Sequence, residues 1–273
     1  MKFVARALLI IVAFPIFILS VFSINIRFQF LSSGFWINTF EKGNIYSQIS
    51  ENVENRLISR VIAEGGGKSD VTLLSNLISP ESLKDFFEKN IKNILLYANG
   101  KSAEIMVFTP VPLGKIPEGF DLNNLEDFSE EIPLTDFLKG FDISGIRESD
   151  IQAISNFGTW AWVLTAGSFS LLVLVLVLAY LATNPGKHLT TPGIALVLPG
   201  IFMLTAYFAG SFAGRVLTDD FRQSANIGTS LAAIIAPPVI QNVTQIWIWF
   251  GASALILGIL LFFLKKLVYN GSK

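Results

Sequence analysis

A long, predominantly apolar stretch covers residues 160–182 and contains no charged side chain. A helix rises about 1.5 Å per residue, so about 20 apolar residues cross the hydrocarbon core of a bilayer. The pattern therefore predicts a membrane-spanning helix over residues 157–183. Asn184-Pro185-Gly186 supplies a turn signal directly after it.

Three further apolar stretches have the same character. Residues 1–23 place two basic residues before an apolar run, which predicts a signal anchor that forms the first transmembrane helix; a cleaved signal peptide is the alternative. The third span is expected over 192–213, with a kink at Pro199-Gly200. The fourth is expected over 244–264. The predicted fold is a mostly α membrane protein with four transmembrane helices.

Between the first two spans, residues 24–156 show the periodicity of amphipathic helices. From Ile45 onward, apolar residues recur every four positions over about 20 residues, until three consecutive glycines end the pattern at Gly65–Gly67. A second helix is expected after Ser79-Pro80, with the serine as N-cap and the proline as first helical residue. Asn99-Gly100 supplies its stop signal.

The pattern weakens beyond Gly100. Residues 103–108 fit a short strand or an extended segment, and the prolines that follow favour an extended arm. Residues 121–142 are acidic without clear periodicity, whereas residues 144–157 fit a helix that leads directly into the second span. The segment 24–156 is therefore expected to form a mainly helical domain between transmembrane helices 1 and 2.

The connection between the third and fourth spans, residues 214–243, contains an apolar segment at 223–240. This segment is expected either to lie in the membrane interface or pack under the polar domain, or to extend the fourth span as a helix. In each case Pro237-Pro238 is expected to break the helix, because proline lacks a backbone N–H and clashes with the preceding turn. Residues 265–273 form a short basic tail.

Charge is distributed unevenly along the chain. Residues 24–156 hold 19 Asp and Glu residues against 12 Lys and Arg, a net charge of −7, whereas the rest of the chain has a net charge of +6. Lys and Arg accumulate in short loops on the cytoplasmic side of membranes. We therefore expect a multi-pass protein of the cell membrane, with both termini cytoplasmic and residues 24–156 extracytoplasmic.

Few side chains suit catalysis or metal binding. The chain has no Cys and a single His, His188, which excludes zinc–thiolate sites and a Ser-His-Asp triad within 24–156. His188 is expected to be a solvent-exposed residue of a cytoplasmic loop. The acidic group from Glu126 to Asp136 lacks the spacing of a calcium loop and is expected to be a solvated face. The sequence predicts no catalytic residue, no cofactor, no metal ligand and no nucleic-acid partner.

The interiors of the four expected spans contain no Asp, Glu, Lys or Arg. Ionisable residues inside the membrane usually mark proton or ion paths, so their absence argues against an ion-coupled transporter. Polar side chains in the spans are expected to bond a neighbouring helix or their own backbone. They are Thr165, Ser168, Ser170, Thr205, Tyr207, Ser211 and Ser253.

Small residues recur at helical spacing in the last two spans. Small side chains let helix backbones approach closely, which favours association in the membrane. The predicted helix-packing residues are Ala206, Gly210 and Gly214 in the third span and Ala254 and Gly258 in the fourth. Packing within one chain and packing between two chains are both compatible with this pattern.

Three stretches carry a resemblance: Asn44 to Ile49, Leu77 to Leu83, and Tyr97 to Gly100. With the N-terminal anchor and the later spans, they resemble uncharacterised bacterial multi-pass membrane proteins with an extracytoplasmic helical domain. The resemblance implies the same topology and carries no activity.

The predicted function is that of a non-enzymatic scaffold, sensor or partner-binding subunit of the cell envelope. Its expected partners are membrane lipids and another envelope protein, which would bind residues 24–156. Handling of a lipid or hydrophobic ligand is the first alternative, because the outer helices and segment 223–240 are apolar. A membrane-bound enzyme with an unrecognised site is the second. The sequence leaves the oligomeric state open.

Overall fold

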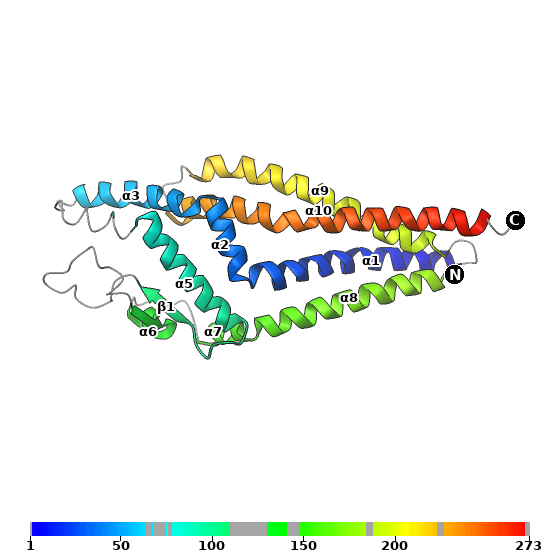
Figure 1. Cartoon of the computed structure of the whole chain (residues 1–273), viewed down its shortest axis with the longest axis horizontal. Coiled ribbons are helices and arrows are strands. Elements are labelled where there is room, and N and C mark those ends of the chain that lie inside the picture. The colour runs from blue at the N-terminus through cyan, green and yellow to red at the C-terminus, as the bar shows by residue number, and fades with distance from the viewer. Residues whose placement is uncertain are drawn as a thin grey trace. The chain divides into compact units, whose positions relative to one another are not determined.

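A computed structural model gives the fold (Figure 1). It describes residues 2–63, 67, 75, 78–109, 130–140, 148–183, 188–222 and 227–270. This part of the chain is mostly helical and includes one two-stranded sheet, which confirms the predicted mostly α fold. The chain divides into two compact units. The first, here called the membrane unit, is Met1–Gln29, Trp160–Leu217 and Val239–Lys273; the second unit is Phe30–Thr159 and Thr218–Pro238.

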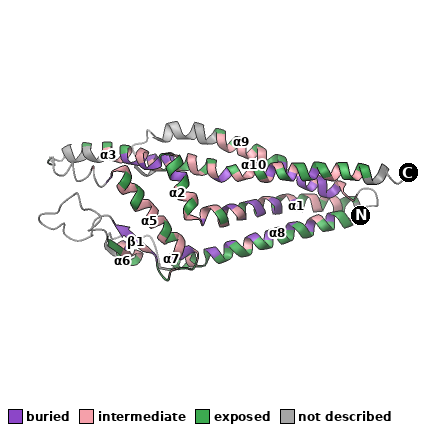
Figure 2. Ribbon diagram, viewed as in Figure 1, coloured by how far each residue is buried: buried purple, intermediate pink, exposed green. Residues whose placement is uncertain are grey.

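Within the described part of the chain, four helices are long and apolar enough to cross a membrane, as predicted. They identify a membrane protein. Their candidate spans are Phe3–Phe30, Phe157–Leu181, Thr190–Phe212 and Thr229–Leu267. The elements that contain them are α1 (Lys2–Ile24) with the π-helix η1 (Asn25–Phe30), α8 (Phe157–Leu181), α9 (Thr190–Arg222) and α10 (Ile227–Asn270). Much of α8 is exposed (Figure 2), as a lipid-facing helix requires.

The described residues at the start of the second unit form the helices α2 (Ser33–Lys42), α3 (Ile45–Ala63) and α5 (Pro80–Ala98). Contacts join each pair of them. Their core is a chain of aromatic rings in edge-to-face contact, in which Phe40 lies 5.7 Å from Tyr46 and 5.8 Å from Phe87 between ring centroids. Such pairs add to the stabilisation that burial of apolar surface provides. Phe40, Tyr46 and Ile49 are all buried.

The predicted ends of α5 are confirmed, whereas the glycine stop predicted for α3 lies largely outside the described residues. The Ser79 hydroxyl accepts a hydrogen bond from the Ser82 backbone N–H at 3.2 Å, so it caps α5 as expected. The helix ends at Ala98, and Gly100 has a φ of +68°, a conformation that glycine adopts without steric cost. By contrast, α2 was not predicted.

Beyond α5, the described residues of the second unit include a small sheet and two short helices. Strand β1 (Met106–Thr109) pairs antiparallel with β2 (Glu130–Pro133); α6 (Leu134–Gly140) and α7 (Glu148–Ser155) follow. Of the two alternatives for 103–108, a short strand or an extended segment, β1 confirms the short strand, which begins at Met106. The helix predicted over 144–157 is present as α7, and Asn156 alone separates α7 from α8, which contains the second span. The proline-rich arm expected after β1 lies outside the described residues.

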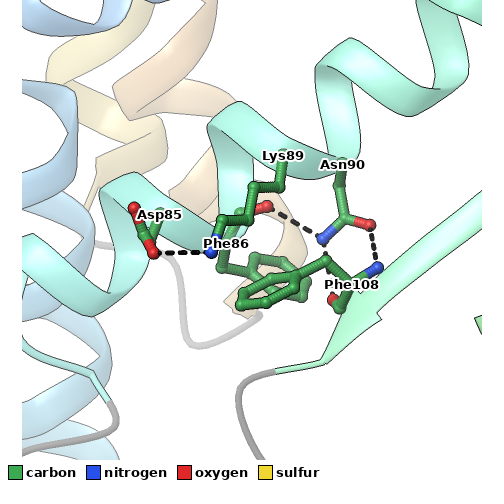
Figure 3. Close-up of polar contacts among 5 residues, drawn as sticks. All are labelled: Asp85, Phe86, Lys89, Asn90 and Phe108. Carbon is green, nitrogen blue, oxygen red and sulfur yellow. Dashed lines mark hydrogen bonds and ion pairs between the residues drawn. The ribbon is translucent and has the colours of Figure 1, made fainter. Parts of the chain in front are cut away.

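The outer edge of β1 is held by one side chain of α5 (Figure 3). The Asn90 side-chain amide donates to the Phe108 carbonyl and accepts from the Phe108 N–H, both at 2.9 Å. Both backbone groups of Phe108 therefore point away from β2, and Asn90 supplies the partners that a third strand would supply. Lys89 lies 4.0 Å from the centroid of the Phe108 ring and pairs with Asp85 at 2.9 Å.

The prediction that Pro237-Pro238 breaks the helix is wrong, because α10 runs from Ile227 to Asn270 with both prolines inside it. The alternative of a helical extension of the fourth span is correct, and residues 214–243 are largely helical. Packing within the second unit explains why. A Cβ at Gly43 would lie 3.0 Å from Cγ of Pro238, so the proline ring contacts the turn after α2 directly. Tertiary contacts of this kind override local propensity.

A second contact holds the first turns of α10. The Ser230 hydroxyl, which is fully buried, donates to the Asn52 side-chain oxygen on α3 at 3.2 Å. The segment Thr218–Pro238 therefore belongs to the second unit, whereas Val239 onward belongs to the membrane unit. Helix α10 thus contributes residues to both units, as α8 and α9 also do.

Candidate functional site at the π-helical end of α1

Two glycine pairs bring the backbones of α9 and α10 into contact. A Cβ at Gly200 would lie 2.9 Å from the Gly251 carbonyl oxygen, and a Cβ at Gly258 would lie 2.8 Å from that of Gly193. No real Cβ makes so short a contact, so only glycine allows this approach. Of the predicted packing residues, Gly258 lies in this seam and Ala254 is buried.

The other predicted packing residues lie elsewhere. A Cβ at Gly210 would lie 3.8 Å from Thr244, an ordinary contact, and Ala206 is half-buried. The side-chain surroundings of Gly214 lie outside the described residues. Sequence reasoning missed Gly193, Gly200 and Gly251, although the two glycines of each helix stand seven residues apart, the spacing of two helical turns. That spacing was the available signal.

In the membrane unit, α1 lies between α8 and α10 (Figure 1), and its last turns carry a group of polar side chains. The Ser20 hydroxyl donates to the Ile16 carbonyl at 2.8 Å, and the Ser23 hydroxyl donates to the Ser20 carbonyl at 2.7 Å. Such bonds compete with the regular α-helical ladder. The helix then continues as the π-helix η1, a form that is rare and frequent at functional sites.

Hydroxyl groups join α1 to α8. The Ser23 and Ser168 oxygens lie 3.3 Å apart, and the Thr165 hydroxyl donates to the Ala161 carbonyl at 2.7 Å, with the Ser23 carbonyl 3.3 Å away. Ser23, Thr165 and Ser168 are all buried. These contacts confirm the predicted role of Thr165 and Ser168 as partners between helices or of their own backbone. Thr205 likewise bonds the Ile201 carbonyl at 2.9 Å.

Two carboxamides join the same end of α1 to α10. Asn25 donates from Nδ2 to the Val243 carbonyl, and Gln29 donates from Nε2 to the Asn242 carbonyl, both at 3.1 Å. The side-chain oxygens of Asn25 and Gln29 are buried and bond no described residue. Asn25 is fully buried. Because a buried unbonded acceptor costs about 1–3 kcal/mol, these oxygens favour a bound water or another hydrogen-bond donor.

Among the described residues, Arg27 brings a positive charge to this region. Its guanidinium carbon lies 5.3 Å from the Trp162 ring centroid and 5.9 Å from that of Phe28, and the two rings meet edge to face at 6.2 Å. A cation over an aromatic face is attracted by the ring quadrupole. The sequence prediction missed this group, because it ended the first span at residue 23. The signal was an arginine between aromatic residues directly after an apolar stretch.

The group formed by Ser23, Asn25, Arg27, Gln29, Thr165 and Ser168 is not suited to proton transfer. Serine, threonine and carboxamide side chains do not exchange protons in the physiological range. The arrangement instead holds three helices together and places a cation among aromatic rings at one end of the spans.

His188 lies against the end of α8. Its Nδ1 is 2.9 Å from the Tyr180 carbonyl and 3.2 Å from the Thr183 hydroxyl, and the His188 and Tyr180 rings are 5.0 Å apart. It is therefore half-buried rather than the fully exposed loop residue expected. Since Nδ1 must donate to the carbonyl, the ring acts as a cap for the helix C-terminus.

No group of three or more His, Cys, Asp or Glu side chains in the described residues is arranged to hold a metal ion. Glu126 and Asp127 of the acidic group lie outside the described residues, whereas Glu130 and Glu131 belong to β2 and Asp136 to α6. Comparisons with protein-family models, curated proteins and solved structures give no match.

Proposed function

We propose that the chain is a non-enzymatic membrane protein of the cell envelope that presents residues 24–156 outside the cell membrane to bind another envelope protein. In this role it acts as a scaffold, sensor or partner-binding subunit. Both termini are cytoplasmic, since basic residues gather at the two ends of the chain and acidic ones in its middle.

Exposed apolar side chains of the second unit carry this proposal. In the part of the unit that the structure describes, the exposed large apolar residues are Ile94, Ile154 and Phe157, which are 40–45% exposed. Ile94 lies on α5 and Ile154 on α7, and these two helices are in contact. Apolar side chains on adjacent helices outside the spans suit contact with a protein partner.

Photocrosslinking in native membranes tests whether this face of the second unit binds a protein partner. A photoreactive residue is placed in the full-length protein at Ile94, at Ile154, or at Glu51, an exposed polar position of α3. We expect one discrete protein adduct from the first two positions and none from Glu51. The same adducts from all three positions, or only lipid and self adducts, would contradict partner binding at this face.

Single-cysteine labelling separately tests on which side of the membrane residues 24–156 lie. Because the chain has no native cysteine, only the introduced residue can react. In intact cells, a membrane-impermeant maleimide should label the Glu51→Cys variant, whereas Lys266→Cys should react only after permeabilisation. The reverse pattern would place residues 24–156 in the cytoplasm and refute the proposed orientation.

A further inference from the structure

Three buried polar atoms where η1 meets α10 have no hydrogen-bond partner among the described residues. They are the side-chain oxygens of Asn25 and Gln29 on η1 and the indole Nε1 of Trp247 on α10. The nitrogens of the two carboxamides are engaged, since they donate to the Val243 and Asn242 carbonyls at 3.1 Å. Each carboxamide oxygen can accept a hydrogen bond, whereas the indole N–H can only donate one.

The contacts of α1 and α10 place the three atoms in one region of the membrane unit. Asn25 bonds the Val243 carbonyl, and Trp247 stands one turn after Val243 on the same face of α10. A helical side chain leans toward the N-terminus of its helix, so the Trp247 ring lies over the turn that Asn25 bonds. Trp247 also packs on the core cluster that contains Val21, which is one turn before Asn25.

The chemistry of these atoms restricts what can bind them, because a common ligand must both accept and donate hydrogen bonds. A metal cation binds oxygens but cannot accept an indole N–H. A lipid headgroup or a peptide needs an open path, and all three atoms are buried. A water molecule both accepts and donates, is small enough to be enclosed, and typically makes about three hydrogen bonds when buried in a protein.

We propose that a water molecule is bound between η1 and α10, where it accepts the Trp247 indole N–H and donates to the side-chain oxygens of Asn25 and Gln29. A bridging water satisfies buried polar groups nearly as well as a direct hydrogen bond does. The π-helical end of α1 is then joined to α10 by direct and by water-mediated bonds. The site needs no protein partner, so it stands independently of the proposed function.

Solid-state NMR of the full-length, isotope-labelled protein in lipid bilayers tests this site. In a water-edited experiment, magnetisation that starts on water is transferred to protein groups that contact water. We expect transfer to the Trp247 indole N–H, whose signal is assigned by its loss in Trp247→Phe. Asn25→Leu should abolish the transfer, because it removes one acceptor and fills the space with an apolar group. Gln29→Met removes the other acceptor at similar side-chain length and should weaken the transfer.

Thr205→Val is the matched control. It removes a polar group from a span, but the Thr205 hydroxyl bonds the Ile201 carbonyl of its own helix, so the Trp247 signal should stay as in the wild-type protein. No transfer to the Trp247 N–H in the wild-type protein would overturn the proposal. Equal transfer in the wild-type protein, Asn25→Leu and Gln29→Met would overturn it as well. If Asn25→Leu does not fold, the comparison of Gln29→Met with Thr205→Val decides.

Discussion

The Gly200–Gly251 contact predicts that the smallest possible side chain destabilises the α9–α10 seam. In Gly200→Ala the new Cβ would lie 2.9 Å from the Gly251 carbonyl oxygen and 3.2 Å from the Leu255 nitrogen. Both are backbone atoms, so a rotamer change cannot relieve the clash. The two helices must move apart and lose contact along the seam.

The magnitude follows from two opposing effects. Inserting a methyl group into packed structure costs about 1–3 kcal/mol, whereas replacing glycine by alanine inside a helix gains up to about 1 kcal/mol. We expect a net loss of up to about 2 kcal/mol in the free energy of unfolding. Gly167 on α8 is the matched control, because a Cβ there would have no neighbour within 4 Å. Gly167→Ala should be neutral or slightly stabilising.

Reversible unfolding of the full-length protein in mixed detergent micelles, followed by circular dichroism, measures both variants. A Gly200→Ala protein as stable as Gly167→Ala would refute the reasoning, since the two substitutions differ only in the space around the new methyl group.

Three further perturbations test other contacts. Asn90→Ala leaves the Phe108 N–H and carbonyl without their side-chain partner and should cost about 2 kcal/mol in chemical unfolding, whereas the exposed Lys92→Ala should cost almost nothing. Burial, and then the nearby Glu88 and Glu41 carboxylates, raise the pKa of the Tyr46 hydroxyl. The folded protein therefore holds the phenolic proton more tightly than the unfolded chain does. The free energy of unfolding should be independent of this group below pH 10, the ordinary pKa of tyrosine, and should fall above it. Tyr46→Phe should remove that fall in a pH series of unfolding curves. Ser168→Ala should lower the free energy of unfolding by only about 0.6 kcal/mol, the average for hydrogen bonds between membrane helices. A loss above about 2 kcal/mol would contradict this expectation and show that the hydrogen bond is unusually strong.

Local patterns were sufficient for the elements that local physics determines. Helix α5 follows from a serine cap, a proline at the first helical position and a stop at Asn99-Gly100, all of which act within one turn. The four spans follow from apolar length alone. Helix α2 could not be found in this way, because Trp36, Ile37 and Phe40 are modest helix formers, and their helix depends on packing against α3 and α5.

The candidate site depended even more on tertiary structure. The sequence shows Thr165 and Ser168 as polar residues in a span, but it does not show that Ser23 of α1 is their partner. The π-helix has no sequence signature, so the positions of Asn25, Arg27 and Gln29 relative to α8 and α10 could not be derived. The prediction that Pro237-Pro238 breaks the helix was wrong for the same reason, since the sequence does not show that Pro238 contacts the turn after α2.

The amide of Asn90 also limits how a partner can recognise the second unit. Strands that end in an open row of N–H and carbonyl groups invite another chain to add a strand, which is a common route both to specific peptide binding and to aggregation. On β1 the outer N–H and carbonyl of Phe108 are already occupied by a side chain that comes from a helix. At Phe108 a partner therefore meets a side chain rather than free backbone, and this position is protected from adding a strand of a neighbouring chain.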